Sequence, residues 1–288
     1  MHKLTPCIQG LVAINIAAVI FGTAALFGRL GISPFWIVDM RALFAALALF
    51  VIARVQGGMD LPPRGLRASI AVTGLILAVH WITFFASVQV AGIAVATLTF
   101  AAFPFFTVVL DVFLQRRKPH LAEIAASLAI VAAVGLLVSP RSGNAAGVGL
   151  GLASALAFAL FGHASKRLGR DLSPLHISLF QNGVVALIVM PCLFFVGPSP
   201  TRPIDWVWLV LLGTVTTALM HQLYFYALRR LSASTCSGFV ALEPVYAILF
   251  AGILFHQTIS LWTAVSAAFI LGASFTLLRL ENVPRALP

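Results

Sequence analysis

Charged residues are scarce in this sequence: they make up 9% of its 288 residues, while 61% are hydrophobic. A typical soluble domain is about 25% charged and about 45–50% apolar. A chain this poor in charge, with a mean hydropathy of +1.05, has too little polar surface to stay in water. The composition therefore predicts an all-α polytopic membrane protein with the lipid bilayer as its solvent.

The usual features of an enzyme or a metalloprotein are also lacking. The three cysteines are scattered and form no CxxC pair, so neither a disulfide framework nor a thiolate metal site is expected. No HExxH motif or pair of aspartates occurs, and the connections between apolar runs are too short to hold a soluble active site. The stretch Gly147-x-Gly-x-Gly151 has neither the preceding strand nor the Lys-Ser/Thr pair of a phosphate loop. We therefore expect no catalytic residues, no metal, no cofactor and no nucleotide-driven pump.

Charges, glycines and prolines divide the sequence into ten apolar segments. Most of them reach the roughly 20 residues that a helix needs to cross a bilayer. The sequence thus predicts ten transmembrane helices with approximate bounds Ile8–Leu30, Phe35–Ala53, Leu66–Val88, Ala91–Leu114, Leu121–Val138, Val148–Leu168, Pro174–Val196, Trp206–Leu228, Ala233–Phe255 and Leu261–Leu280.

The 18 lysines and arginines are distributed unevenly over the connections between these segments. One side of the membrane receives Arg29, Arg141 and Arg202. The other side receives Lys3, Arg54, Arg64, Arg67, Arg116, Arg117, Lys118, Lys166, Arg167, Arg170, Arg229, Arg230, Arg279 and Arg285. Because cytoplasmic loops carry the excess of basic residues, both termini are expected in the cytoplasm and the protein in the cytoplasmic (inner) membrane. The net charge of +10 is then explained by the orientation of the chain in the membrane, and no nucleic-acid partner is expected.

The sequence matches itself at a shift of 140 residues without gaps. The matching landmarks are Phe21-Gly22 with Phe161-Gly162, Ser33-Pro34 with Ser173-Pro174, Phe85 with Phe225, Pro104 with Pro244, and Leu114 with Leu254. Each unit holds five segments, and an odd number makes the second unit enter the membrane from the opposite side. The pattern predicts two inverted five-helix repeats, residues 1–140 and 141–288, an arrangement that belongs mainly to transporters working by alternating access.

One match of this repeat is unequal. Glu243-Pro244 in the second unit corresponds to Phe103-Pro104 in the first. Both prolines are expected to break a helix, because proline lacks the N–H group that the helix requires. An ionised acid near the bilayer centre costs at least about 2.5–3.5 kcal/mol. Any chemistry of this pair is therefore expected to belong to Glu243.

This chain resembles the EamA family of the drug/metabolite transporter (DMT) superfamily in three features. They are the two five-helix units, Arg41 in the second segment, and the stretch EPVYAILFAGILF that begins at Glu243. The resemblance covers essentially the whole chain. It implies ten helices around a central cavity, and a carrier of amino acids or other small metabolites, more often an exporter than an importer. The chain is similar to the aromatic amino-acid exporters (the YddG-like branch), although no single motif separates the branches. Many members of the family have Gly-Glu where this chain has His256-Gln257. A role in ion coupling that belongs to that glutamate in the family therefore does not carry over to this chain.

The charged residues within the apolar segments each allow two interpretations. Glu243 is either a site for a substrate amine or a coupling proton, or a structural acid that fixes the kink at Pro244. Arg41 either binds a substrate carboxylate, or extends its side chain outward or to another helix. Asp39 lies two residues from Arg41, and the two point to different faces of a helix. Asp111 is interpreted as a solvated charge at the end of its segment.

Large aromatic or imidazole side chains at membrane depth are candidates for a cavity wall, because they stack on a ligand and still hydrogen-bond. Packing between helices with a satisfied N–H group is the alternative. The candidates, among which Trp81 corresponds to His221 and Phe84 to Tyr224 in the repeat, are His80, Trp81, Phe84, Phe103, His163, His221 and Tyr224.

Small residues at Ala264, Ala268 and Gly272 form a face of the last segment that favours close helix packing and a homodimer through this helix. The sequence as a whole predicts a secondary transporter for a small-molecule substrate, either coupled to protons or a passive facilitator. A membrane scaffold or assembly protein and an intramembrane enzyme are the alternatives.

Overall fold

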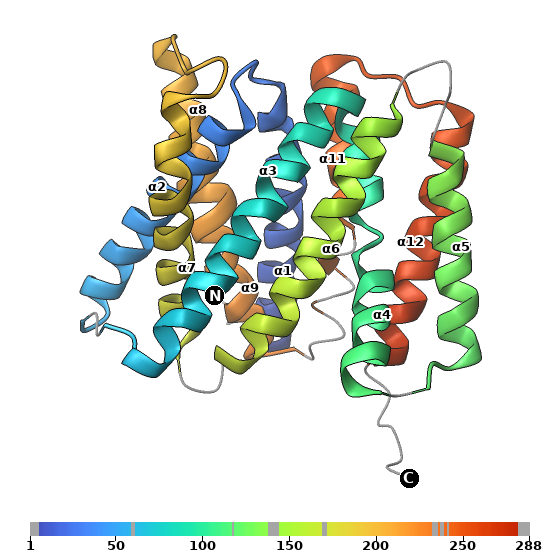
Figure 1. The fold of residues 1–288 in the computed structure, drawn as a ribbon, viewed down its shortest axis with the longest axis horizontal. Coiled ribbons are helices and arrows are strands. Elements are labelled where there is room, and N and C mark those ends of the chain that lie inside the picture. The colour runs from blue at the N-terminus through green and yellow to red at the C-terminus, as the bar shows by residue number, and fades with distance from the viewer. Residues whose placement is uncertain are drawn as a thin grey trace.

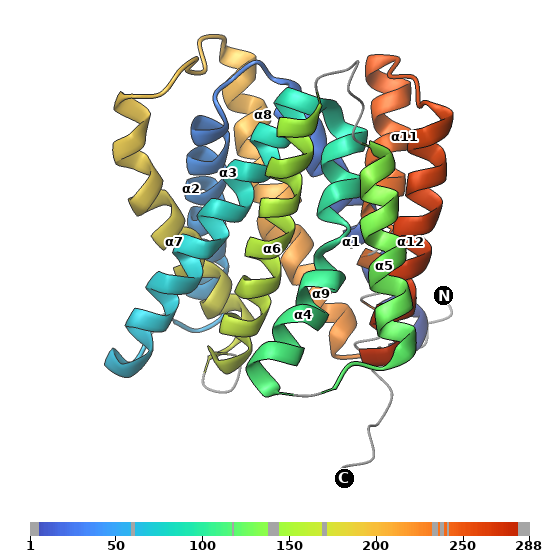
Figure 2. The same cartoon turned by 45° about the vertical axis from the view of Figure 1, so that its right-hand side comes forward.

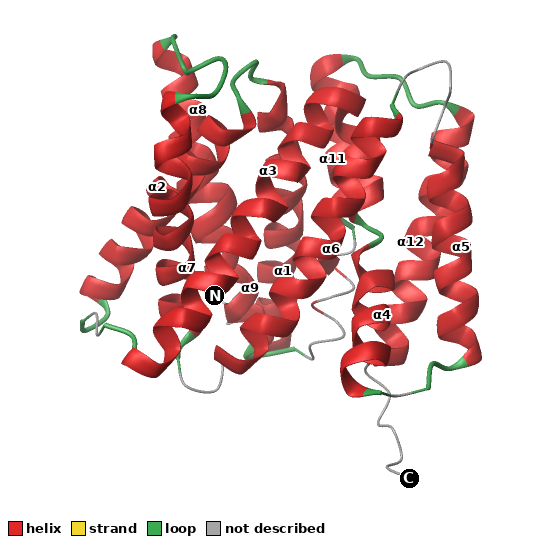
Figure 3. Ribbon diagram, viewed as in Figure 1, coloured by secondary structure: helices red, strands yellow, loops and turns green. Residues whose placement is uncertain are grey.

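The computed structural model describes residues 6–58, 61–116, 118–137, 144–168, 172–231, 236, 239–240 and 242–281. Within these ranges the chain is built of helices and contains no strand (Figure 3). The prediction of an all-α fold is confirmed. The elements of Figure 1 are α1 (Pro6–Thr23), η1 (Ala24–Arg29), α2 (Pro34–Val55), α3 (Arg64–Phe100), α4 (Phe103–Gln115), α5 (Leu121–Leu137), α6 (Ala145–Leu168), α7 (Pro174–Val189), η2 (Met190–Phe194), α8 (Pro203–Gly213), η3 (Thr214–Leu219), α9 (Met220–Leu228), α11 (Glu243–Phe255) and α12 (Leu261–Glu281).

Six of these helical stretches are long and apolar enough to cross a membrane, and four shorter apolar helices accompany them in the described part of the chain. The molecule is therefore a multi-pass membrane protein. Three of the predicted spans are composite: α1 continues into η1, α7 continues into η2, and α8 continues through the π-helical η3 into α9. The first half of the predicted span Ala233–Phe255 lies mostly outside the described residues.

The boundary between the third and fourth predicted spans is a sharp turn inside α3. Gly92 has φ 85° and ψ 168°, a conformation open mainly to glycine. The Gln257 amide lies against it, 2.9 Å from the position that a Cβ would take. The fourth predicted span thus consists of the end of α3 and, after a break at Ala101-Ala102, of α4.

Several helices recur at the 140-residue spacing of the sequence match. The starts of α2 and α7, of α4 and α11, and of α5 and α12 each lie 140 residues apart. Both α4 and α11 have 13 residues, and each is followed by a left-handed residue, Arg116 (φ 53°) and His256 (φ 50°). In Figure 1 the two members of each pair run in opposite directions.

The connections gather at two ends of the helix bundle (Figure 1). One end holds the α2–α3, α4–α5 and α6–α7 connections, and half of the 18 lysines and arginines belong to these connections or to the adjoining helix ends. The opposite end holds η1–α2, η2–α8 and α11–α12. There Arg202 hydrogen-bonds Asp205 in the first turn of α8 at 2.7 Å, and this bond raises the pKa of the Arg202 guanidinium.

Helix α12 packs along α5, and Figures 1 and 2 both place them side by side. Its small residues Ala264, Ala268 and Gly272 are exposed. A Cβ at Gly272 would meet nothing within 4 Å. The homodimer through this helix stays a prediction.

The glycines that begin α6 serve close packing against α3. A Cβ at Gly147 would collide with Ala91. A Cβ at Gly151 would collide with the Thr99 hydroxyl, whereas one at Gly149 would meet nothing within 4 Å. Two of the three glycines therefore let two backbones approach, as small residues do in membrane proteins.

Replacing Gly151 by alanine should destabilise the protein, because overpacking of a tight contact costs about 1–3 kcal/mol. Gly149→Ala is the matched control on the same helix. It should be neutral or stabilise by up to about 1 kcal/mol, since alanine favours the helix over glycine. Thermal unfolding of the purified variants in detergent checks both. Equal melting temperatures would contradict the proposed packing role of Gly151.

Candidate functional site

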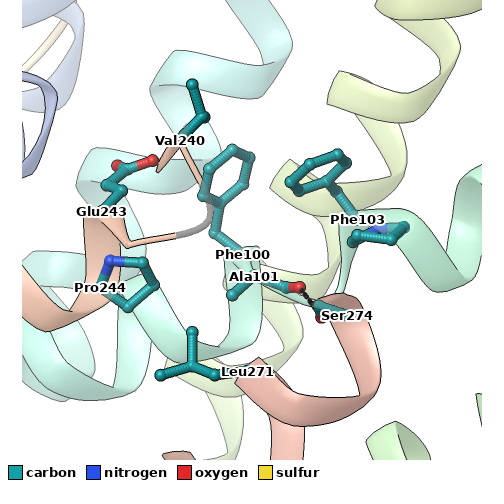
Figure 4. A pocket seen from close by; sticks show the side chains of 9 residues that line it. Phe100, Ala101, Phe103, Val240, Glu243, Pro244, Leu271 and Ser274 are labelled. Atoms are coloured by element: carbon teal, nitrogen blue, oxygen red, sulfur yellow. Dashed lines mark hydrogen bonds between the residues drawn. The ribbon is translucent and has the colours of Figure 1, made fainter. Parts of the chain in front are cut away.

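The two helix breaks meet at one pocket. The break before α4 and the break before α11 face each other there, and α12 closes one side. Figure 4 shows Glu243 and Pro244 on one side and Phe103 on the other, with Phe100 between them. The pocket is lined by Phe100, Ala101, Phe103, Pro104, Val240, Glu243, Pro244, Leu271 and Ser274.

The prolines begin helices at this pocket. Pro104 and Pro244 lie in the first turn of α4 and α11, where a missing N–H group is tolerated. The break before α4 leaves the Ala101 carbonyl without its usual helical donor. The Ser274 hydroxyl of α12 donates to this carbonyl at 2.8 Å. A side chain 173 residues away thus stabilises the broken backbone.

Glu243 is a buried acid at the start of α11, with 4% of its surface exposed. The first turn of a helix favours a negative charge. Gly22 on α1 allows α11 to come close, since a Cβ there would lie 3.2 Å from the Glu243 carbonyl oxygen. Within the described part of the chain, the Glu243 carboxylate makes no hydrogen bond and no ion pair within 4.0 Å. The carboxylate is therefore available to a ligand in the pocket.

Arg41 is buried in the core, with 3% exposed, so it does not extend outward. Its Nε donates to the Thr217 hydroxyl at 2.8 Å. Its guanidinium carbon lies 4.2 Å from the centre of the Trp81 ring and 6.0 Å from that of Phe85. Thr217 belongs to the π-helical η3, and such π-helical turns often mark functional sites.

Arg41 is the electrostatic centre of the candidate residues. Its guanidinium lies within electrostatic range of the Glu243 carboxyl group and of the His80 and His221 rings. The Thr217 hydroxyl, which accepts from Arg41, belongs to the turn before His221. No ion pair within 4.0 Å joins Arg41 to Glu243 in the described structure. A basic and an acidic side chain are thus buried in one protein core without a direct ion pair between them in the described structure.

An aromatic cluster adjoins the pocket. The His80 ring lies 5.0 Å from that of Phe158 and 5.1 Å from that of Phe100. Phe100 stacks on Phe103 at 5.6 Å and meets Phe84 edge-on at 5.7 Å. Because Phe100 and Phe103 belong to both the cluster and the pocket, the pocket has an apolar aromatic wall.

His80 is held by α6. Its Nδ1 lies 2.8 Å from the Ser154 hydroxyl and 3.1 Å from the Ser154 carbonyl oxygen. Both oxygen atoms belong to one residue of α6, so the ring is held against this helix. This geometry favours interhelical packing for His80 over direct ligand contact.

Of the candidate residues, Phe103, Pro104, Glu243 and Pro244 line the pocket. The others do not: Arg41, His80, Trp81, Phe84, His163, His221 and Tyr224. Tyr224 packs among apolar residues of α1 and α9, and not against Phe84, its counterpart in the repeat. His163 on α6 binds Asp111 on α4, with 2.8 Å between Nε2 and a carboxylate oxygen. The interpretation of Asp111 as a solvated charge is therefore wrong. Its position near a helix end suggested water, but a histidine of another helix is its partner.

Sequence reasoning missed four residues that position these groups: Thr217, Ser274, Ser154 and Phe158. Three are small hydroxyl residues within apolar runs, where their bonds to distant helices leave no local pattern. Ser154 and Phe158 lie four residues apart, which places both on one face of α6. This spacing is the one signal that was present. No group of histidine, cysteine and acidic residues in the described structure has the arrangement of a metal site.

Comparison with known proteins identifies the fold and the family. The family model of the EamA-like transporter family matches residues 8–139 and again residues 145–279. The chain belongs to the EamA-like transporter family. The two matches of the EamA-like model together cover most of the sequence, and this protein is a membrane transporter.

Relatives of this EamA-like transporter carry the same general description. An uncharacterized transporter of Archaeoglobus fulgidus is 25% identical over 263 residues, covering 91% of this chain and 93% of the relative. The uncharacterized transporter YxxF of Bacillus subtilis is 27% identical over 244 residues, covering 81% and 78%. One solved crystal structure shares the fold, with a TM-score of 0.66 at 19% identity over 96% of this chain and 98% of its own.

Proposed function

We propose that this protein is a secondary transporter of small zwitterionic metabolites, above all amino acids, in the cytoplasmic membrane. Export is the favoured direction, as the resemblance to amino-acid exporters implies. The observation that carries the proposal is that Arg41 and Glu243 are both buried in one core, without an ion pair between them in the described structure. An amino acid presents a carboxylate and an ammonium group, and it would satisfy both residues at once.

The surroundings of the two charges favour a substrate with an apolar part. Glu243 lines the pocket whose wall is formed by Phe100 and Phe103. Trp81 covers one face of the Arg41 guanidinium. A sugar phosphate would require several basic groups, and the described core contributes only Arg41. An amphipathic amino acid suits this combination better.

The architecture supports alternating access. Helices that recur at a 140-residue spacing run in opposite directions, which is what an inverted repeat requires. The broken helices that carry Phe103 and Glu243 meet between the two units, where transporters of this kind hold their substrate. The basic end of the bundle is proposed to face the cytoplasm, with both termini on that side.

Counterflow in liposomes tests the proposal directly. The purified protein is reconstituted into vesicles loaded with an unlabelled amino-acid mixture, and uptake of labelled phenylalanine, leucine and alanine is followed. We expect exchange well above that of protein-free vesicles for at least one of them. A matched mixture of sugar phosphates should not exchange. Exchange of none of these solutes would overturn the amino-acid proposal and favour a scaffold.

A further inference from the structure

Two glycines that correspond in the repeat, Gly22 on α1 and Gly162 on α6, have opposite surroundings. Gly22 is buried, and a Cβ there would lie 2.5 Å from the Cβ of Tyr246 and 3.2 Å from the backbone nitrogen of Ala247, both on α11. Gly162 is exposed, and a Cβ there would meet nothing within 4 Å in the described structure. Helix α1 thus touches α11 at its glycine, whereas the corresponding helix α6 leaves its glycine uncovered.

The repeat indicates which contact Gly162 lacks. Helices α6 and α4 correspond to α1 and α11, and 140 residues separate Phe106 and Thr107 of α4 from Tyr246 and Ala247. A close approach of Gly162 to Phe106 and Thr107 would therefore be the counterpart of the contact between α1 and α11. Neither residue comes within 4 Å of the place that a Cβ of Gly162 would take.

Long side chains, rather than backbones, join α4 to α6. The rings of Phe158 and Phe103 lie 5.2 Å apart, and Nε2 of His163 lies 2.8 Å from a carboxylate oxygen of Asp111. In the sequence of α6, Gly162 stands between Phe158 and His163. The two helices are therefore in contact without the close approach that α1 and α11 make, and the glycine suited to such an approach is present but unused.

The exposed side of Gly162 belongs to the face of α6 that packs on the protein. Phe158, one turn earlier on this face, packs against the main core, and Ala159 is 3% exposed. Leu156 and Leu160, on the other side of the helix, are 39% and 38% exposed, as expected of side chains that face lipid. The exposure of Gly162 therefore indicates open space beside α4 and not contact with lipid.

The two glycines lie in opposite halves of the bundle. Gly22 is next to the last residue of α1 and lies toward the end that holds the η1–α2 connection, whereas Gly162 lies toward the basic end (Figure 1). Helices α11 and α4 both begin at the pocket, at Glu243 and Phe103, and run toward these two opposite ends. Starting from the pocket, the helices are in close contact toward the first end, and the open space lies toward the basic end.

Other corresponding contacts of α1 and α6 are close in both units. A Cβ at Gly10 of α1 would lie 2.9 Å from the side chain of Leu231. In the other unit Ala91, which corresponds to Leu231, would collide with a Cβ at Gly147 of α6. The difference between the units therefore concerns the contacts with α11 and α4, which are the two helices that begin at the pocket.

We propose that the α1–α11 and α4–α6 contacts are the two gates of the transporter, and that transport closes them in alternation. This structure is closed at Gly22 and open at Gly162. In the second state Gly162 lies against Phe106 and Thr107, α11 moves away from Gly22, and the pocket opens to the other end of the bundle. An inverted repeat permits this exchange, because each unit can adopt the conformation of the other. The inference rests on the proposed alternating access, but not on the identity of the substrate.

Distances between spin labels test the exchange in the full chain without any substrate. Labels are placed at exposed positions that correspond in the repeat. Leu114→Cys with Leu156→Cys reports on α4 and α6, and Ile16→Cys with Leu254→Cys reports on α1 and α11. In lipid nanodiscs, double electron–electron resonance should give two distances for each pair. The native cysteines are replaced first: Cys7→Ser, Cys192→Ser and Cys236→Ala.

Alanine at the two glycines should shift the two populations in opposite directions. Gly22→Ala collides with α11 in this structure, so it should favour the second state by about tenfold. Gly162→Ala has room here but would collide with α4 in the second state, so it should favour the present state by about tenfold. Gly149→Ala is the matched control on α6, since a Cβ there also meets nothing within 4 Å, and it should leave the populations unchanged.

Gly162→Ala decides the outcome even if Gly22→Ala does not fold, because the added methyl group meets no atom within 4 Å in the described structure. Populations of Gly162→Ala equal to those of Gly149→Ala would overturn the proposal. A single distance for each label pair, unchanged in every variant, would overturn it as well.

Exchange of labelled phenylalanine, leucine and alanine in vesicles separates the gates from the proposed function. We expect the maximal exchange rate to fall by about tenfold in Gly162→Ala, because the second state is depleted. Gly149→Ala should keep the wild-type rate, and equal rates of the two variants would contradict the gating role. If the wild-type protein exchanges no amino acid, the proposed function fails, while the label distances still decide whether the two contacts alternate.

Discussion

Replacing Glu243 by glutamine should lower the apparent affinity for amino acids by about 10- to 100-fold. A hydrogen bond to a charged group contributes about 1.5–3 kcal/mol, and each 1.4 kcal/mol is tenfold in affinity. Glutamine has nearly the shape of glutamate, so the pocket between α4 and α11 should keep its form. Folding should be unaffected or improved, because the buried carboxylate has no hydrogen-bond partner within the described structure.

Counterflow over a range of substrate concentrations measures this effect, and thermal unfolding confirms that the variant is folded. Glu123→Gln is the matched control, since Glu123 is also a buried glutamate but lies on α5, away from the pocket. It should leave the affinity at the wild-type value. A sharper comparison uses a monocarboxylate without an amine, whose weak binding Glu243→Gln should not reduce further. Equal affinities of wild type and Glu243→Gln for amino acids would exclude Glu243 as the ammonium site.

Much of the fold and part of the site could be predicted from the sequence for the same physical reason. Charges and helix breakers are so unfavourable within a bilayer that each one stands out from an apolar run. Arg41, Glu243 and the two prolines were found in this way, and the structure buries both charges in the core and places both prolines at helix starts. The 140-residue spacing was found from the prolines and recurs in the helix starts.

What could not be predicted depends on contacts between distant segments. The Thr217 hydroxyl lies 176 residues from Arg41, and His163 lies 52 residues from Asp111. A single sequence records which residue types are present but not which helices face each other. The interpretation of Asp111 as solvated depends on its place near the end of its segment and on Arg116, five residues later. The partner that decides its role belongs to another helix.

Replacing Arg41 by glutamine should be the more damaging change, because Arg41 has both a structural and a proposed binding role. The variant loses the bond to Thr217 and the stacking on Trp81, which together amount to about 1–3 kcal/mol of stability. It also leaves Glu243 buried without a compensating charge. We expect a lower melting temperature and a loss of amino-acid affinity of about 10- to 100-fold.

Three further variants separate these roles. Arg54→Gln removes an exposed arginine from the same helix and should change neither property. Arg41→Lys keeps the charge but loses the planar group that stacks and donates through Nε, so its affinity should lie between those of wild type and Arg41→Gln. The double variant Arg41→Gln with Glu243→Gln should be more stable than Arg41→Gln alone, since it removes the uncompensated acid.

A comparison of two substrates tests whether Arg41 binds the substrate carboxylate. If it does, Arg41→Gln should weaken amino-acid binding strongly and leave the binding of a simple primary amine unchanged, the reverse of the pattern for Glu243→Gln with a monocarboxylate. These two opposite selectivities require two separate charge sites in one cavity, and a structural role of either residue would not produce them. If Arg41→Gln weakens amine and amino acid by the same factor, Arg41 acts through the packing of α2 on η3, and the zwitterion proposal loses its carboxylate partner.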